Sequence, residues 1–220
     1  MAYVRMALKD FEKLKQKMAG MKKAPEKVMK SITAEAKKRV PGWVATEVTK
    51  VYGIKKSEIT GQKVGSVKTV GNGFKDLKFI YAGRLLTPTH FSMSPKAPKE
   101  GGYTLKATII KGERATLGKV KKLTKKQRAA MAKNFTRSGT RSSDHSPIML
   151  MSTGNTRADG TNNIPFQRKS NNRKDVQVIK TVSLPQMVSS ERTAEAIQTA
   201  INEGLGKRLD HYLNRYMPDG

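Results

Sequence analysis

The sequence lacks cysteine altogether, and this absence already removes several classes of site. With no Cys among its 220 residues, the chain has neither a disulfide framework nor a metal site built on thiolates. Aromatic residues are also few, with 6 Phe, 6 Tyr and 1 Trp. A protein that reads single strands by stacking bases would be expected to carry more of them.

Long apolar runs are missing as well. No stretch approaches the roughly 20 apolar residues that span a bilayer, and hydrophobic content is only 36%. The segment from Met1 to Met18 mixes acids with bases and has no continuous apolar core, so it does not read as a secretory signal. We therefore expect synthesis in the cytoplasm and no membrane partner.

Acidic residues are scarce, and the charge they leave is the strongest compositional feature. Against 44 Lys and Arg there are 17 Asp and Glu, a net charge of +27. Gly118–Asn134 holds seven bases and no acid, whereas Ser189–Gly220 holds four bases and five acids. A surface this basic attracts polyanions, of which nucleic acid is the commonest.

The stretch Phe74–Gly112 carries the clearest strand patterns, and we expect the chain to be organised around it. Leu77–Leu86 and Tyr103–Lys111 both alternate apolar and polar residues, which predicts strands with one buried face. Val64–Val70 is a weaker strand, and Gly71-Asn72-Gly73 predicts a hairpin between it and Leu77–Leu86. Further strands are expected at Ile148–Met151 and Val176–Lys180.

Helical spacing appears on both sides of this β region. One helix is expected from Val4 to Met18. A second begins at Pro25 and ends near Gly53, with Pro41-Gly42 expected to kink or stop it. A long final helix is expected to be capped by Ser189 or Ser190. The predicted core includes these residues: Phe79, Tyr81, Leu105, Ile109, Ile197 and Ile201.

These elements predict an α+β fold. N-terminal helices precede a central, mainly antiparallel β-sheet with long basic loops, and a long C-terminal helix packs on the sheet. We expect residues 1–220 to form one domain, with insertions near 118–134 and 153–163. Leu123–Asn134 has good helix formers but few apolar anchors, so it predicts a surface helix or a flexible insertion that orders on a partner.

Catalytic patterns are weak. The three histidines, His90, His145 and His211, have no ligand-like spacing, and the pair Asp144-His145 beside serines does not by itself make a triad. Gly71-Asn72-Gly73 lacks the Lys-Ser/Thr of a phosphate loop. We expect no catalytic residue, no metal site and no cofactor, and a binding or structural protein rather than an enzyme.

The order of several segments is distinctive. Two N-terminal helices lead to "VYGIKKSEIT" (Val51–Thr60), "LKFIYAGRLLTPTHF" (Leu77–Phe91) and "YTLKATIIKG" (Tyr103–Gly112). "IPFQRKS" (Ile164–Ser170) and "VIKTVSLPQMVSS" (Val178–Ser190) follow, before the long helix. This order resembles the minor tail protein Z family of long-tailed bacteriophages, also called tail completion proteins. The similarity covers most of the chain but not Gly118–Asn134 or Thr153–Asn163.

The resemblance implies a virion protein at the head-proximal end of the tail, made in the host bacterial cytoplasm. Relatives act late in assembly as a ring that makes the tail competent to join the head. Implied partners are further copies in a ring, of which six is the expected number, tail terminator or tail tube proteins, and head–neck connector proteins. A ring interface or family motif is expected at these residues: Arg84, Phe91, Phe166, Arg168, Leu184, Pro185 and Met187.

Alternatives stay open at this point. A basic nucleic-acid-binding protein without catalytic activity is the second reading, although no RNA-recognition, zinc-finger or Gly-x-x-Gly clamp pattern is present. A peripheral membrane protein would need large apolar residues opposite the charges of Leu123–Asn134, which has too few. The basic stretch is expected to meet either the DNA end or an acidic face of a neighbour through these residues: Lys119, Lys121, Lys122, Lys125, Lys126, Arg128 and Lys133. It can also be a solvated loop.

Overall fold

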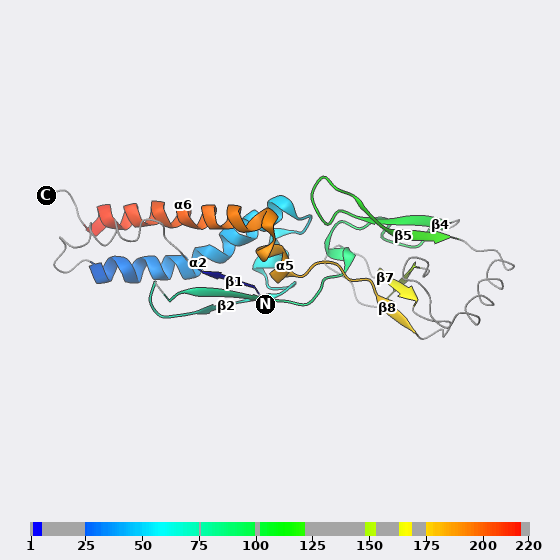
Figure 1. Cartoon of the computed structure of the whole chain (residues 1–220), viewed down its shortest axis with the longest axis horizontal. Coiled ribbons are helices and arrows are strands. Elements are labelled where there is room, and N and C mark those ends of the chain that lie inside the picture. Colours follow the sequence, from blue (N-terminus) through cyan, green and yellow to red (C-terminus); the bar gives the residue numbers. More distant parts are fainter. Residues whose placement is uncertain are drawn as a thin grey trace. The chain divides into compact units, whose positions relative to one another are not determined.

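The computed structural model confirms the α+β class, with two long helices and several antiparallel sheets (Figure 1). It describes residues 2–5, 25–74, 76–99, 102–121, 148–152, 163–168 and 175–216. The chain divides into two compact units. Unit 1 contains Met1–Val51, Lys55–Arg84 and Val182–Gly220, and unit 2 contains Tyr52–Ile54 and Leu85–Thr181. That residues 1–220 act as one domain stays a prediction.

Helix α2, Pro25–Val51, begins as predicted but does not stop at Pro41. Proline in a helix interior removes one backbone hydrogen bond and crowds the preceding turn, which usually kinks or ends the helix. Figure 1 shows the ribbon of α2 changing direction about midway and then continuing. The apolar stripe on both sides of Pro41 is fully buried, and this packing holds the two halves in one helix. Its residues are Val28, Ile32, Ala36, Val40, Val44 and Val48.

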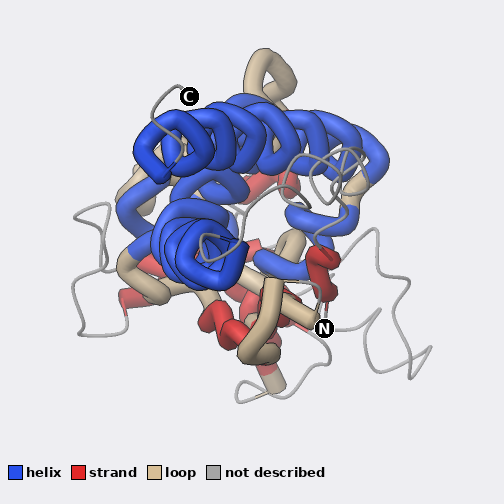
Figure 2. The backbone as a smooth tube through the Cα atoms, turned by 90° about the vertical axis from the view of Figure 1, so that its left-hand side faces the viewer, coloured by secondary structure: helices blue, strands red, loops and turns tan. Residues whose placement is uncertain are grey.

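Helix α6, Glu191–Tyr216, matches the predicted final helix. The Ser190 hydroxyl accepts a hydrogen bond from the Arg192 amide at 3.3 Å, which satisfies one free amide of the first turn. The stripe expected to be buried, Ile197 to Leu213, is buried at Ile197, Ile201, Leu205 and Leu213 and only partly buried at Leu209. However, α6 packs mainly along α2, and not on the sheet as expected (Figures 1 and 2). Two matching apolar stripes bury each other best when the helices lie side by side.

A glycine lets the two long helices approach. A Cβ built on Gly204 of α6 would lie 2.6–2.8 Å from three ring carbons of Trp43 on α2. Only glycine fits the indole ring at this distance. Gly204 therefore marks close packing between the two helices, while a Cβ built on Gly206 would meet open space.

The sheet of unit 1 has the order β1-β3-β2 and is antiparallel throughout. Its strands are β1 (Ala2–Arg5), β2 (Ser66–Val70) and β3 (Lys78–Ala82). The predicted helix from Val4 is wrong at its start, because Val4 pairs with Phe79 in the sheet. The free edge of β3 offers backbone partners that outweigh a weak local helical pattern. The rest of that helix lies outside the described residues.

The predicted hairpin is present between β2 and β3, with Val70 opposite Lys78. Gly71 has φ +107°, a conformation that favours glycine, although the connection is longer than a two-residue turn. As predicted, Leu77, Phe79 and Tyr81 are buried. A short helix that the pattern missed, α5 (Leu184–Ser189), contacts β1 and β3 and is held by a capping box between Ser183 and Gln186. Helix α3, Lys56–Thr60, follows α2.

The described part of unit 2 contains two further antiparallel sheets, so the described strands form three sheets and not one central one. Strands β4 (Gly102–Ala107) and β5 (Ala115–Lys121) make a two-stranded sheet. The second sheet contains β6 (Ile148–Ser152), β7 (Asn163–Arg168) and β8 (Val176–Val178) in the order β6-β7-β8. The expectation that Phe74–Gly112 forms one sheet is wrong, because β3 and β4 lie in different sheets and different units.

The core of unit 2 joins its two sheets. Met93, Leu105, Ile148 and Leu150 are buried together, with Tyr103, Leu117 and Ile179 packed against them. Ile109, expected in the core, is only partly buried because β4 ends at Ala107. The predicted loop Thr87–Gly102 contains the short 3-10 helix η1, Pro88–His90, and a bridge from Ser94 to Lys106.

Candidate functional site

The predicted basic stretch is described only at its beginning. Lys119 lies in β5 and is exposed, and the backbone of Lys121 belongs to the same strand. Residues 118–121, the first part of the insertion expected near 118–134, pair with β4 in a sheet, and whether the rest is an insertion stays a prediction. The other predicted contacts lie outside the described residues: Lys122, Lys125, Lys126, Arg128 and Lys133.

Most residues of the expected ring interface or family motif are structural within the chain. Phe91, Leu184, Pro185 and Met187 are buried. Arg84 is exposed, Phe166 is partly buried in β7, and the side chain of Arg168 lies outside the described part. The buried members pack inside their units. Among the described side chains of this set, Arg84 is the exposed one that a neighbouring protein can contact.

The structure reveals a basic surface on the first half of α2. Lys27, Lys30, Lys37 and Lys38 are all exposed on the first half of α2. At 3.6 residues per turn, these positions lie opposite the buried stripe of α2. We call these four residues the α2 lysine face. The spacing of these lysines in the sequence is compatible with one helix face. It identifies a surface only when the segment is known to form one helix whose apolar side is buried.

Two of the three acids of α2, Glu35 and Glu47, pair with bases outside the α2 lysine face, and the third, Glu26, is exposed at the start of the helix. Glu35 accepts a hydrogen bond from the Arg39 Nε, and the Arg208 Nε of α6 lies 3.8 Å from the same carboxylate. The hydrogen bond from Arg39 and the charges of Arg39, Arg208 and Lys38 hold the pKa of Glu35 below its usual value, against a smaller opposing effect of burial. Glu35 thus links the two long helices. Within the described residues, no ion pair of the α2 lysine face is present.

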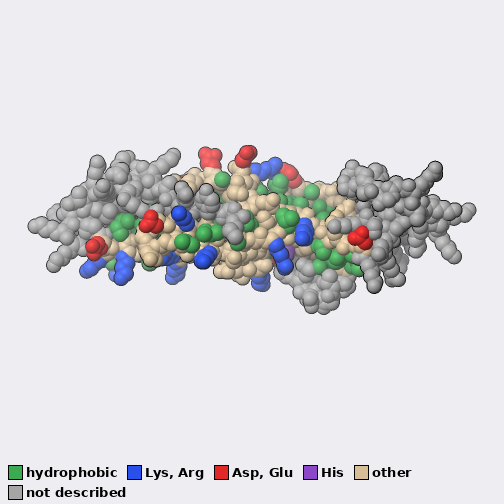
Figure 3. Space-filling model, turned by 60° about the horizontal axis from the view of Figure 1, so that its bottom comes forward, with side chains coloured by type: hydrophobic (Ala, Val, Ile, Leu, Met, Phe, Trp, Pro, Cys, Tyr) green, Lys and Arg blue, Asp and Glu red, His purple; other side chains and the backbone are tan. Residues whose placement is uncertain are grey.

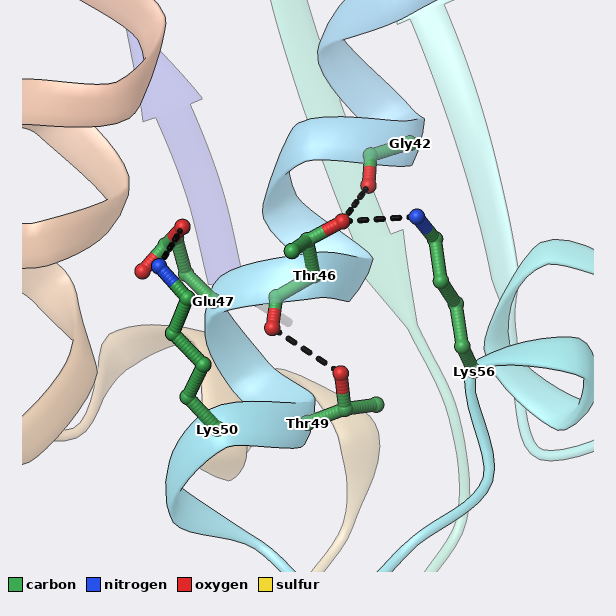
Figure 4. Close-up of polar contacts among 6 residues, drawn as sticks. All are labelled: Gly42, Thr46, Glu47, Thr49, Lys50 and Lys56. Atoms are coloured by element: carbon green, nitrogen blue, oxygen red, sulfur yellow. Dashed lines mark hydrogen bonds and ion pairs between the residues drawn. The ribbon is translucent and has the colours of Figure 1, made fainter.

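The second half of α2 is braced by a small polar network (Figure 4). The Thr46 hydroxyl donates to the Gly42 carbonyl at 2.9 Å and accepts from the Lys56 Nζ at 2.7 Å. Thr49 donates to the Thr46 carbonyl at 2.9 Å, and the Lys50 Nζ lies 2.7 Å from the Glu47 carboxylate. These contacts tie the start of α3 to the turn that follows Pro41. They use Lys50 and Lys56, which are therefore less available to a partner than the α2 lysine face.

Helix α6 offers no comparable surface. It carries four bases and four acids, whereas α2 carries six bases and three acids. Figure 3 shows Lys and Arg side chains at several places on the face that it draws. The α2 lysine face brings four exposed lysines together on one side of one helix of unit 1.

The described residues bring no catalytic or metal-binding constellation together. No group of three His, Asp, Glu or Cys among them is placed to hold a metal ion. His90 lies in η1 and His211 on α6, while His145 is outside the described part. The Tyr81 hydroxyl is buried without a hydrogen-bond partner, and burial raises its pKa. No described helix is long and apolar enough to span a bilayer.

Comparison of the chain with family models, curated proteins and solved structures found no match. The net charge of +27 and the exposed lysines of α2 are features of the chain that bear on its partners.

Proposed function

We propose that this chain is a structural virion protein at the head-proximal end of a long-tailed phage tail. It completes the tail, makes it competent for head–tail joining and works without catalysis. The observation that carries the proposal is the ordered set of segments that resemble tail completion proteins. Those segments include β3, β4, β7 and α5, so the resemblance involves the framework of both units and not one surface loop.

The proposed assembly is a ring, with six copies as the expected number. A ring uses heterologous contacts, in which one surface of a subunit meets a different surface of the next and rotation closes the set. Each subunit must then present two unlike faces. Exposed Arg84 is the part of the predicted interface that can contact a neighbour directly. Neighbours in the tail are tail terminator or tail tube proteins, and on the head side connector proteins.

Localisation within particles tests this proposal. Negative-stain images of purified particles labelled with an antibody to this chain should show label at the head–tail junction. Mass photometry of the purified protein should show, at some concentration, a species of six times the monomer mass. A label confined to the capsid surface or to the distal tail tip would contradict the proposal. So would a monomer both in solution and in particles.

A basic nucleic-acid-binding protein without catalytic activity is the second candidate. The α2 lysine face favours it, because four exposed ammonium groups on one helix face suit a phosphate backbone. The two candidates separate by experiment. Particles lacking this chain should contain filled heads without attached tails under the first candidate. If only the second candidate is correct, tails should attach normally in particles lacking this chain, and the defect should affect the DNA.

A further inference from the structure

We propose that the α2 lysine face binds the phosphate backbone of duplex DNA, independently of base sequence. This inference deepens the nucleic-acid-binding candidate and does not depend on a place in the phage tail. It assigns the contact to described residues of unit 1, Lys27, Lys30, Lys37 and Lys38, in addition to any contact made by the basic stretch Lys119–Lys133.

Geometry supports a backbone contact. From Lys27 to Lys38 the helix rises about 16 Å, at about 1.5 Å per residue. Duplex DNA carries one phosphate per about 3.4 Å of axis on each strand, so a strand lying along α2 presents about five phosphates over the same length. Four flexible lysine side chains can therefore each reach a different phosphate.

The chemistry of the surface favours DNA over an acidic protein. The centre of a protein interface is usually rich in aromatic residues, Met and Arg, and lysine is depleted there. Between its lysines this helix face carries exposed Ala34 and no aromatic side chain, and exposed Glu26 lies directly before Lys27. Protein–DNA interfaces are instead polar and strongly positive. A surface of lysines with little apolar area is suited to phosphate.

The same composition indicates that base sequence is not read. Direct readout in the major groove relies on side chains that meet base edges in pairs, chiefly Arg on guanine and Asn or Gln on adenine, with lysine also used on guanine. Lysine binds phosphate as a point charge. None of the four residues of the α2 lysine face is Arg, Asn or Gln. Binding should therefore be equally strong for duplexes of unrelated sequence.

Charge-neutral variants of the full chain test the proposal. Lys27, Lys30, Lys37 and Lys38 are changed together to Gln, and fluorescence anisotropy measures binding to a labelled 30-base-pair duplex over a range of salt concentrations. Each phosphate contact contributes about 0.9 to the slope of log affinity against log salt. The variant should therefore lose up to about 3.6 from this slope, and bind about tenfold or more weakly at low salt.

A matched control removes the same charge elsewhere in unit 1. Lys55, Lys63, Lys68 and Lys78 are exposed and lie outside α2, so changing these four to Gln removes four charges without touching the α2 lysine face. This control should retain most of the wild-type affinity for the duplex and most of the slope of log affinity against log salt. Equal losses in both variants would show that binding follows net charge alone, and would overturn the assignment to α2.

Further outcomes separate this inference from the functions proposed above. If the α2 variant binds DNA like the wild type while Gln at Lys121, Lys122, Lys125 and Lys126 abolishes binding, the protein binds DNA but not through α2. If the wild-type protein binds poly-glutamate and not duplex DNA, the occupant is an acidic protein surface and the inference is wrong. If the fourfold variant unfolds at a lower temperature than the wild type, the double variant Lys30→Gln, Lys37→Gln replaces it. The slope of log affinity against log salt should then fall by about half as much as expected for the fourfold variant.

Discussion

Helices α2 and α6 lie against each other in unit 1, have almost equal length, and differ in nearly every property that sequence rules use. Helix α2 contains an interior proline and an excess of three bases, while α6 contains two interior glycines and balanced charges. Both nevertheless form, because each buries its apolar stripe on the other. The comparison indicates that packing of the two apolar stripes stabilises both helices. The charge of their outer faces can differ because it takes no part in that packing.

The largest expected effect tests the shared packing. Ile201→Ala on α6 and Ile32→Ala on α2 each remove a fully buried side chain. Each should lower the free energy of unfolding by about 2–5 kcal/mol, as truncation of a buried Ile typically does. Urea denaturation of the purified protein measures the loss. Thr199→Ala, at an exposed position of α6, serves as the control and should stay within about 0.5 kcal/mol. An unchanged midpoint for either Ile variant would mean that the two stripes do not face each other.

A pair of glycine substitutions gives the next largest effect and sharpens the comparison. Gly204→Ala places a methyl group against the rigid Trp43 ring and should cost about 1–3 kcal/mol, as overpacking usually does. Gly206→Ala meets open space, so the higher helix propensity of alanine should stabilise α6 by about 0.5–1 kcal/mol. Thermal unfolding of the two variants should shift in opposite directions. Equal shifts would show that α2 does not approach α6 at Gly204.

The smallest expected effect concerns the charge link between the helices. Because the pKa of Glu35 is lowered in the folded protein, its carboxylate stabilises the fold above the unfolded value of 4.5, and this contribution is lost as pH falls through the folded pKa. Glu35 is partly solvated, so Glu35→Gln should cost less than about 1 kcal/mol at pH 7. Wild type and variant should converge in stability at low pH. A difference that persists at pH 3 would point to packing and not charge.

Much of the helical part of the fold could be predicted from sequence. The stripes from Val28 to Val48 and from Ile197 to Leu213 identified the two long helices, and the alternation around Phe79 identified β3. The prediction failed where a contact with residues distant in sequence was stronger than the local pattern. Val4, expected at the start of a helix, pairs instead with the edge of β3.

The candidate site was harder to predict than the fold. The density of bases drew attention to Lys119–Lys133, because a run of lysines is visible without knowing any structure. The α2 lysine face is spread over twelve residues and has acids and apolar residues between its members. It becomes a surface only when one helix places those lysines on one side and buries the rest.

By itself, the sequence determined which segments are amphipathic and that the chain is strongly basic, since these follow from residue type and spacing alone. The tertiary structure decided which stripes face each other, that Pro41 lies inside one helix, and that β3 and β4 belong to different sheets. Those outcomes depend on contacts between residues distant in sequence, where the burial of a whole helix face outweighs the local cost of one proline. The same burial leaves the lysines of the outer face of α2 exposed, where a partner can reach them.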